Sequence, residues 1–364
     1  MKCVNQMPTK ATRNQPQMTY VFLRKLLPFG LVSFAISTLW SQEFLKPDAW
    51  ELSLGVHARV DDNIDNRDET GALQRDITPY RVRLTPQAIY RISDNTSFVA
   101  RARSQYSHSG NADSVDTFLD KYAVQFQQKD FSGWVGRSDY PFWTQNDIFW
   151  DGDITPAGVF ATRAFDRGDF STTLSGGYFY LPIGEYDFDD TLFAAQAVLS
   201  KQTDDWTWSF AGGLHAIDGQ GLRADHQTIS ASAQLKTNVM EQELSLGCDY
   251  YIDAEAEPIL PGEGDNDTAV ILTASFGNIY QKGHWMVGAT YAHVEENSLY
   301  HGYSQPDWLS YPRGSGARGM EGSSLWIKYA LSSLSSLTTQ LYLREAVDSL
   351  HESNRLRFEF NSSF

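Results

Sequence analysis

Cysteine is almost absent from this chain of 364 residues, which contains only Cys3 and Cys248. Cys3 lies in an N-terminal segment that we expect to be removed, so the mature chain would hold one thiol, with no internal disulfide and no cysteine-based metal site. Long apolar runs are scarce as well, because no stretch of 18 uninterrupted apolar residues occurs after residue 41. A transmembrane helix needs about 20 such residues, so we expect none there.

Catalytic and phosphate-binding motifs are also missing. The sequence has no G-x-S-x-G elbow and no phosphate loop, and its eight histidines show no metal-ligand spacing. The formal net charge of −16 argues against binding to nucleic acid. We therefore expect neither an enzyme nor a bound cofactor or metal.

The first 41 residues differ from the rest and predict export. Arg24 and Lys25 precede the apolar stretch 26–39, which is too short to span a bilayer comfortably, and Ser41 is a small residue suited to cleavage. We expect a signal peptide over residues 1–41, with Met18 as an alternative start. Its removal deletes five of the 29 Lys and Arg residues and none of the 45 Asp and Glu residues, which leaves a net charge of −21.

The chain after residue 41 has a period of two. Apolar side chains take the even positions of residues 50–60 and polar or small side chains take the odd ones, and 243–250, 325–331 and 355–364 alternate similarly. Successive side chains of a strand point to opposite faces, so each segment would have one apolar and one polar face. A negative mean hydropathy with 13% aromatic residues is typical of a barrel with a wet lumen and a lipid-facing wall.

Sixteen alternating segments are expected, separated by gaps that are short and long in turn. The segments are 49–60, 78–92, 96–108, 118–128, 130–138, 157–166, 169–180, 189–200, 204–215, 227–237, 240–251, 267–280, 283–294, 323–333, 336–346 and 355–364. Bacterial transmembrane barrels have short periplasmic turns and longer external loops. The predicted fold class is therefore all-β: a transmembrane antiparallel β-barrel of about 16 strands over residues 42–364, with both ends on the periplasmic side.

Two segments resemble outer-membrane porins of Gram-negative bacteria. The last ten residues, RLRFEFNSSF, place Phe358, Phe360 and Phe364 on the apolar face, similar to the C-terminal signal for outer-membrane assembly. Residues 131–165 pass from a strand that ends near Arg137, through an aromatic and Asp-rich stretch, to a strand of small residues. The PEFGG-type motif of enterobacterial porins is absent, so the resemblance is one of position.

The resemblance implies a pore for the passive diffusion of small hydrophilic solutes and ions, in which the third external loop folds inward and narrows the lumen. The third long gap of this chain is 139–156. The implied partners are outer-membrane lipid, lipopolysaccharide, the barrel-assembly machinery and further copies in a homotrimer, for which the small outward residues Ala195 and Ala197 leave a flat face. The alternative is a closed-lumen barrel with a structural or adhesion role.

Basic side chains recur on the predicted polar faces of the first five strands. They are His57, Arg59, Arg81, Arg83, Arg101, Arg103, Lys121 and Arg137, of which Arg137 has an ambiguous face. An arginine on the lipid face near the bilayer midplane would cost about 2–4 kcal/mol, so we expect these residues to line the pore. Alternatively, the arginines pair with lumen carboxylates such as Glu51 and stiffen the wall.

The third long gap supplies the predicted constriction. Its candidate residues are the acidic Asp139, Asp147, Asp151 and Asp153 and the aromatic Phe142, Trp143, Phe149 and Trp150. The carboxylates would face the basic side chains, and opposed charges across a narrow neck bias which ions pass. The aromatic residues either pin the loop against the inner wall, which we favour, or form a surface along which sugars slide.

A further acidic cluster falls in the first predicted gap, 61–77. Its members are Asp61, Asp62, Asp65, Asp68 and Glu69. Carboxylates of this kind bind Ca²⁺, but the spacing matches no defined calcium loop, and we favour a solvated face. Acidic external loops would favour the entry of cations.

Overall fold

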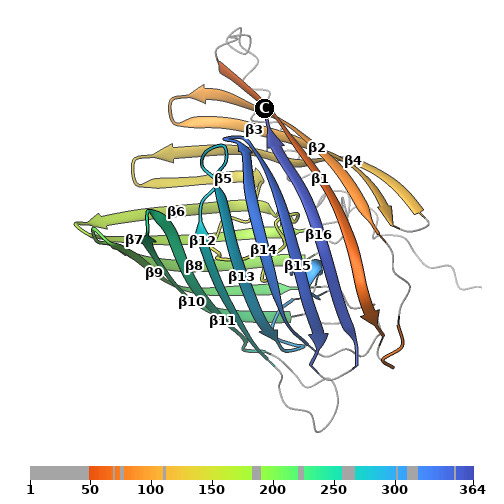
Figure 1. Ribbon diagram of the computed structural model, residues 1–364. Coiled ribbons are helices and arrows are strands. Elements are labelled where there is room, and N and C mark those ends of the chain that lie inside the picture. Colours follow the sequence, from red (N-terminus) through yellow and green to blue (C-terminus); the bar gives the residue numbers. More distant parts are fainter. Residues whose placement is uncertain are drawn as a thin grey trace, which may run out of the picture. The chain divides into compact units, whose positions relative to one another are not determined.

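The computed structural model describes residues 49–68, 70–73, 78–109, 112–182, 190–219, 225–255, 267–300, 302–309, 319–347 and 350–364, and the expected signal peptide lies outside them. The described part folds into a closed antiparallel barrel of sixteen strands, which confirms the predicted fold class. Each strand pairs with its neighbours in sequence, and β1 pairs with β16 to close the ring (Figure 1). No helix within the described ranges is long and apolar enough to cross a membrane.

The strands follow one another around the barrel in chain order. They are β1 (Trp50–Arg67), β2 (Tyr80–Ser93), β3 (Thr96–Ser109), β4 (Ala112–Gln128), β5 (Phe131–Arg137), β6 (Ala157–Arg167), β7 (Phe170–Leu181), β8 (Asp190–Gln202), β9 (Trp206–Asp218), β10 (Asp225–Val239), β11 (Gln242–Asp253), β12 (Thr268–Gly277), β13 (Trp285–Val294), β14 (Met320–Ser332), β15 (Ser335–Ala346) and β16 (Glu352–Ser363). A short helix, α2 (Pro306–Leu309), lies between β13 and β14.

Each predicted segment overlaps one strand, but several strands run further than their alternation indicates. Strand β1 continues from residue 60 to Arg67, and β4 begins at Ala112 rather than at 118, so the long gap expected over 109–117 was wrong. Beyond the apolar band both faces of a strand carry polar side chains, so the period of two fades although the backbone pairing continues. The turn expected at 238–239 lies at Met240 and Glu241, both with positive φ.

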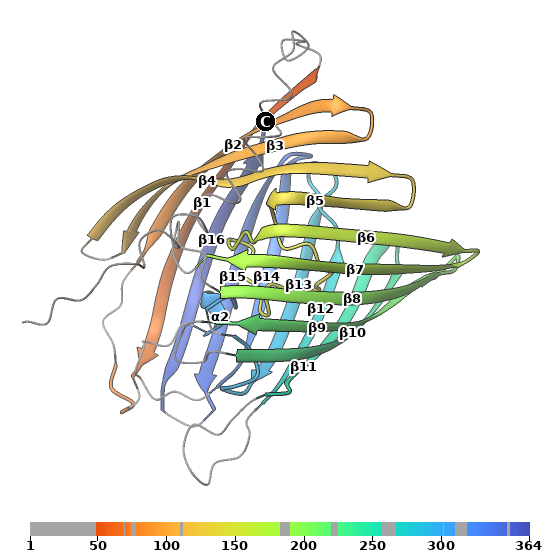
Figure 2. The same cartoon turned by 180° about the vertical axis from the view of Figure 1, so that it is seen from behind.

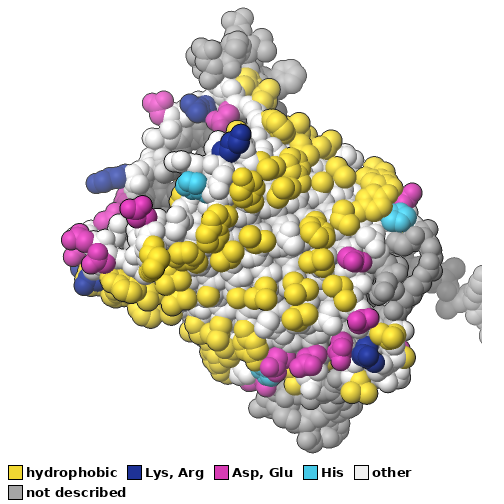
Figure 3. Space-filling view, viewed as in Figure 1, with side chains coloured by type: hydrophobic (Ala, Val, Ile, Leu, Met, Phe, Trp, Pro, Cys, Tyr) yellow, Lys and Arg dark blue, Asp and Glu magenta, His cyan; other side chains and the backbone are white. Residues whose placement is uncertain are grey.

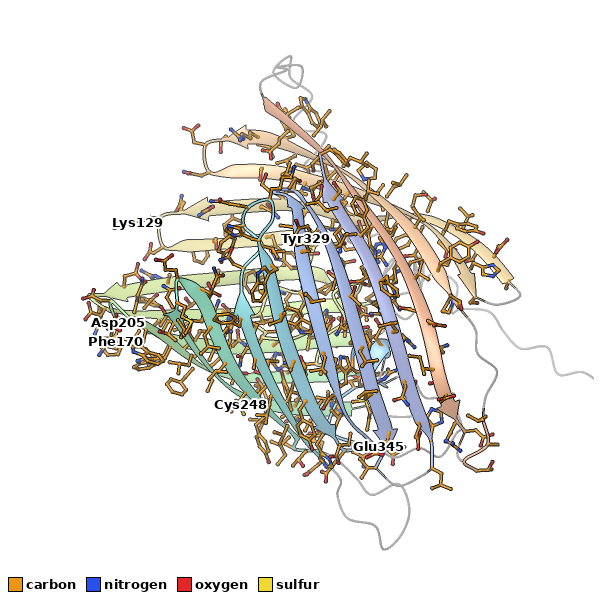
Figure 4. All side chains as sticks on the ribbon, viewed as in Figure 1. Lys129, Phe170, Asp205, Cys248, Tyr329 and Glu345 are labelled. Atoms are coloured by element: carbon orange, nitrogen blue, oxygen red, sulfur yellow. The ribbon has the colours of Figure 1, made fainter. Side chains whose placement is uncertain are left out.

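The two ends of the barrel differ in the length of their connections. Most even-to-odd connections, such as 129–130 between β4 and β5, span two or three residues, whereas 278–284 between β12 and β13 is longer. Lys129 and Asp205 lie at this short-turn end in Figure 4, and Glu345, beside a connection of the other set, lies at the opposite end. Each strand is antiparallel to the next and the number of strands is even. Strand β1 therefore begins, and β16 ends, on the same short-turn side.

The outer wall is apolar, as the alternation predicts. Leu52, Val82, Phe193 and Ile327 are among the large hydrophobic side chains that the barrel exposes. Figure 3 shows hydrophobic side chains spread over this wall, with charged side chains mostly near its two ends. An exposed apolar band bounded by polar ends matches the lipid-facing surface of a transmembrane barrel.

The hydrophobic core lies between the inner face of the strands and two long loops. We call residues 138–156 the β5–β6 loop and residues 295–319 the β13–β14 loop. Phe142, Ile148 and Trp150 of the first loop pack in one cluster with Tyr303 and Trp308 of the second. Phe149 and Leu299 of the two loops belong to the same cluster, and the strands contribute its other buried side chains, which include Phe179, Leu192, Ile271 and Val294. The core therefore fixes both loops to the strands.

Candidate functional site

Basic side chains, seven arginines and one lysine, form a continuous surface on the inner face of β16, β1, β2, β3 and β4. Arg59 and Arg81 are direct cross-strand partners, as are His57 and Arg83, whereas the neighbour Val82 is exposed on the outer wall. Like charges directly opposite one another destabilise a strand pair, so this surface needs counter-charges. We call its members the basic wall; they are Arg59, Arg81, Arg83, Arg101, Arg103, Lys121, Arg355 and Arg357.

A β-bulge in β4 places a buried carboxylate inside the basic wall. The register between β3 and β4 shifts between Arg101 and Ala102, so that Asp120 has no direct partner in the ladder. Asp120 is fully buried and accepts hydrogen bonds from Arg101 at 2.5 Å and from Arg103 at 3.1 Å. The extra residue of a bulge re-aims a side chain. Here the bulge turns the Asp120 carboxylate to the inner face. Regular alternation would have turned it to the lipid side.

Asp153 of the β5–β6 loop lies against three arginines of the basic wall. Its carboxylate accepts two hydrogen bonds from Arg83, each of 2.6 Å, and lies 3.5 Å from both Arg81 and Arg103. Arg103 also donates to the backbone carbonyl of Asp153 at 3.4 Å. A two-pronged arginine–carboxylate pair fixes orientation as well as distance. This contact therefore attaches the end of the loop to β2 and β3.

The beginning of the same loop is attached to β4. Lys121 forms an ion pair with Asp139, whose carboxylate also lies 3.9 Å from Arg101. Arg137, whose face the pattern left ambiguous, is buried and donates to the carbonyl and hydroxyl oxygens of Thr155, at 3.1 and 2.9 Å. The Arg137 bonds join the end of β5 to the end of the loop, and the Ser138 amide donates to the Pro156 carbonyl at 3.1 Å between the first and last loop residues.

The middle of the β5–β6 loop contacts the other side of the ring. Gln145 and Asn146 donate to the Asp249 carboxylate of β11, at 2.9 and 2.5 Å. Gln196 of β8 exchanges two hydrogen bonds with the backbone of Trp143, at 2.8 and 2.9 Å. Strands β2 and β11 stand on opposite sides of the sixteen-strand ring. One loop thus bonds to inner-face side chains of both walls.

Most aromatic side chains of the β5–β6 loop are packed against other side chains and are not exposed. Phe149 stacks on Tyr251 of β11 with ring centroids 4.7 Å apart and planes 5° apart, and Trp150 stacks on Tyr303 at 5.7 Å. Phe142, Phe149 and Trp150 are buried, whereas Trp143 is partly exposed. Burial of this kind favours a pinning role over a surface for sliding sugars.

The β13–β14 loop supplies a second acidic contact that the sequence analysis did not name. Asp307, on α2, accepts hydrogen bonds from Arg59 at 2.9 Å, from Arg355 at 2.7 Å and from Arg357 at 2.7 Å. Gln305 of the same loop donates to Asp147 of the β5–β6 loop at 3.0 Å. The two loops therefore support each other, and each carries one carboxylate that binds several arginines.

Two of the residues that the sequence analysis missed could have been predicted from the sequence pattern. Arg355 and Arg357 alternate with Leu356 and Phe358, so the argument that placed Arg81 in the lumen applies to them as well. No sequence pattern predicts the inward direction of Asp120, because this direction depends on the bulge. Asp307 lies in a long loop without alternation, and only the fold brings it to the basic wall.

Burial and neighbouring charges divide the loop carboxylates into two groups. The arginines of the basic wall hold the pKa of Asp153 and of Asp307 below the ordinary value, despite their burial. Burial together with the Asp153 charge raises the pKa of Asp151 to about 6. Asp153 and Asp307 are thus permanently charged, whereas Asp151 changes charge near neutral pH.

The acidic cluster expected in the first gap is divided by the structure. Asp61 does not lie in a loop: it is buried on β1, where it accepts hydrogen bonds from Arg59 at 2.8 Å and Arg357 at 2.7 Å. Asp62 and Asp65 are exposed on the same strand, and Glu69 lies outside the described residues. Groups of three or more His, Cys, Asp and Glu side chains suited to a metal ion are not found within the described ranges.

The remaining predicted residues lie on strands at the seam and short-turn end. His57 lies 3.5 Å from Glu359 across the β1–β16 seam. Phe358 is exposed on the outer wall, and Phe364 exchanges two backbone hydrogen bonds of 3.0 Å with Leu54. Phe360 pairs with Ala58 of β1 and Leu337 of β15.

Known proteins resemble this chain in structure and not in sequence. No protein-family model matches it, and no curated protein matches it in sequence. OprB of Pseudomonas putida superposes with a TM-score of 0.63 at 9% identity, over 93% of this chain and 97% of that one. A BenF-like porin of Pseudomonas fluorescens gives 0.52 at 12% identity, over 88% and 99%. A Rhodopseudomonas blastica porin gives 0.51 at 12% identity, over 86% and 100%. The chain therefore has the fold of outer-membrane porins.

Proposed function

We propose that the protein is an outer-membrane porin, a water-filled channel through which small hydrophilic solutes and ions diffuse passively. One observation carries the proposal: an apolar outer wall encloses an inner face on which eight basic side chains oppose carboxylates from two loops. Charged groups on the inside of a lipid-facing barrel require a hydrated lumen. No catalytic role is proposed.

The constriction of this channel is formed by the β5–β6 loop, folded into the lumen, with the β13–β14 loop beside it. Support comes from the bonds of Asp153 to Arg83 on β2 and of Gln145 to Asp249 on β11, since one loop that reaches both walls must cross the bore. Ions pass along the basic wall and the loop carboxylates Asp139, Asp147, Asp151 and Asp153, of which Asp139 and Asp153 are paired directly with Lys121 and Arg83. The balance of these basic and acidic groups beside the path sets a weak selectivity.

The chain is exported with a signal peptide over residues 1–41 and inserted into the Gram-negative outer membrane. The short-turn end faces the periplasm and the long loops face outward, toward lipopolysaccharide. Phe358, Phe360 and Phe364 present the signal that the barrel-assembly machinery reads.

The barrel assembles as a homotrimer through a flat part of its outer wall. Ala195 of β8 pairs with Gly176 of β7 and Leu214 of β9, and Ala197 pairs with Leu174 and Gly212, so each alanine has one glycine beside it on the outer wall. Closely approaching walls are favoured where side chains are small. Mass measurement in mild detergent and migration of unheated samples on gels test this, and a monomer in both would contradict it.

Planar-bilayer recording from the purified protein is the decisive experiment for the channel. We expect stepwise conductance increments as single barrels insert. A protein that inserts but gives no steps under any salt condition would instead be a closed-lumen barrel with a structural or adhesion role.

A further inference from the structure

A buried histidine lies directly beneath the β5–β6 loop. His215, on β9, contacts three aromatic residues of that loop: its ring centroid lies 4.8 Å from that of Phe149, 5.7 Å from that of Phe142 and 6.1 Å from that of Tyr140. His215 is 3% exposed, and neither ring nitrogen has a hydrogen-bond partner in the part of the chain that the structure describes. Buried polar groups without partners are rare and invite a functional explanation.

The surroundings of His215 contain no counter-ion for an imidazolium. Its cross-strand partners are Ala194 on β8 and Thr228 on β10, and the Thr228 backbone faces the ring. The titratable groups on the loop and on β11 that pack nearby are the phenols of Tyr140, which is partly buried, and of Tyr251, which is buried.

Two buried carboxylates on the neighbouring strands are engaged elsewhere. Asp249 of β11 accepts hydrogen bonds from Gln145 and Asn146, and Asp190 of β8 accepts them from Tyr300 and Tyr303. A second proton on His215 would therefore create a buried, unpaired cation, which is strongly unfavourable.

His226 provides an internal comparison. It lies on the neighbouring strand β10, is equally buried, and contacts the β13–β14 loop through Tyr300, at a centroid distance of 5.8 Å. Its Nδ1, however, lies 2.8 Å from the Asp253 carboxylate. His226 therefore has a carboxylate beside its ring, whereas His215 has none among the side chains named above.

We propose that His215 is an acid-sensitive latch for the β5–β6 loop. When the imidazole takes a proton from solvent, the packed position of Tyr140, Phe142 and Phe149 becomes unfavourable, and the loop leaves the β8–β11 wall. The ion pair of Asp153 with Arg83 involves a carboxylate that stays charged, because the neighbouring arginines lower its pKa. The loop thus remains attached to β2 and β3 and moves about that attachment.

The size of the acid effect follows because protonation of His215 is linked to the position of the β5–β6 loop. In the detached position the imidazole meets water and titrates near its ordinary value of about 6.5, whereas the packed position excludes the second proton. Lowering the pH from 7.5 to 4.5 then shifts the equilibrium toward the detached loop by about 100-fold.

Two measurements test the latch, and only one of them depends on the proposed channel. Acrylamide quenching of tryptophan fluorescence in detergent micelles reports the exposure of the tryptophans, among which the buried Trp150 lies on the loop, and needs no conductance. Planar-bilayer recording reports transitions between current levels as the loop moves. Both are made at pH 7.5 and 4.5 on the wild type, on His215→Phe and His215→Gln, which cannot take the proton, and on the control His226→Phe.

We expect stronger quenching and more frequent current transitions at pH 4.5 in the wild type and in His226→Phe, and no acid response in either His215 variant. Acid-induced quenching that persists in His215→Phe and His215→Gln would overturn the latch, as would a wild type whose quenching ignores pH. Should one His215 variant fail to fold, the other decides. An acid-dependent change in quenching without any conductance at either pH would support the latch and contradict the channel.

Discussion

Asp153 and Arg83 form a two-pronged ion pair in which both terminal nitrogens of the guanidinium donate to the carboxylate, each at 2.6 Å. The pair connects a loop residue to a strand residue 70 positions away in the sequence. Most cations of the basic wall have a carboxylate partner of this kind, in Asp61, Asp120, Asp139, Asp153 or Asp307. The charge of the neck is therefore nearly balanced, and removal of a single group should change it measurably.

Replacement of Asp153 by Asn should shift the reversal potential of the channel toward anions. The amide keeps the shape of the side chain but leaves Arg83, Arg81 and Arg103 without their shared counter-charge. Reversal potentials in a salt gradient measure the shift. Asp62→Asn, on the exposed part of β1, is the matched control and should have a much smaller effect, since exposed charges are screened within about 10 Å at 0.1 M salt.

Removal of arginines from the basic wall should act in the opposite direction. The triple variant Arg81→Ala, Arg83→Ala and Arg103→Ala deletes three cations and three long side chains, so we expect a higher conductance and a shift toward cations. Arg163→Ala, whose partner Asp130 lies at the short-turn end, serves as the control. If neither property changes, these arginines do not line the constriction.

Replacement of Asp307 by Asn should destabilise the barrel. Asp307 binds Arg59, Arg355 and Arg357, and loss of one partner from a buried ionic cluster costs about 3–5 kcal/mol. The temperature at which the folded gel band is lost should fall. Asp130→Asn breaks an exposed pair, worth about 0–1 kcal/mol, and should leave that temperature almost unchanged.

Selectivity should depend on pH through Asp151. Its pKa is raised to about 6, so its carboxylate is charged at pH 7.5 and mostly neutral at pH 5. The relative permeability to cations should therefore fall as the pH drops through 6. The sign for stability is the opposite: because the folded-state pKa exceeds the ordinary value of about 3.9, the folded state loses stability as the pH rises from about 4 to 6, whereas cation permeability increases over the same range. In Asp151→Asn the step in selectivity near pH 6 should disappear.

Replacement of Phe149 by Ala should loosen the β5–β6 loop. The ring is buried against Tyr251, and deletion of a buried phenylalanine costs about 3–5 kcal/mol of packing. We expect larger current fluctuations at neutral pH, with Trp143→Ala, a partly exposed ring, as the weaker comparison. A drop in sugar flux with a steady current would instead support the sliding-surface hypothesis.

The alternation of polar and apolar residues predicted the strand faces well, because the membrane strongly disfavours charged side chains on the outer face. A charge on the lipid side is costly, so the inward direction of Arg81 and Arg83 follows from the apolar neighbours Val82 and Leu84 alone. The same rule, applied to 355–364, would have added Arg355 and Arg357. No comparable rule governs the inner face, which tolerates polar and apolar side chains alike.

The parts that could not be predicted depend on long-range contacts. Asp61 was assigned to a loop because alternation fades at the external end, although its backbone still pairs with Arg357. The bulge at Asp120 is invisible in the sequence, since one extra residue changes the facing without a change in composition. Asp307 reaches the basic wall only because the hydrophobic side chains around Trp308 fold the loop into place.

The seam between β1 and β16 joins residues that are about 300 positions apart, such as Gly55 and Ser363, whereas the other interfaces join successive strands. Successive strands can pair as local hairpins, but the seam must wait until both ends of the sheet have curled together, and such non-local pairing is slow. Until then the curled sheet has two open edges, whose unpaired backbone groups cost several kcal/mol each in a lipid environment. Ring closure should therefore be the kinetic bottleneck in forming this barrel.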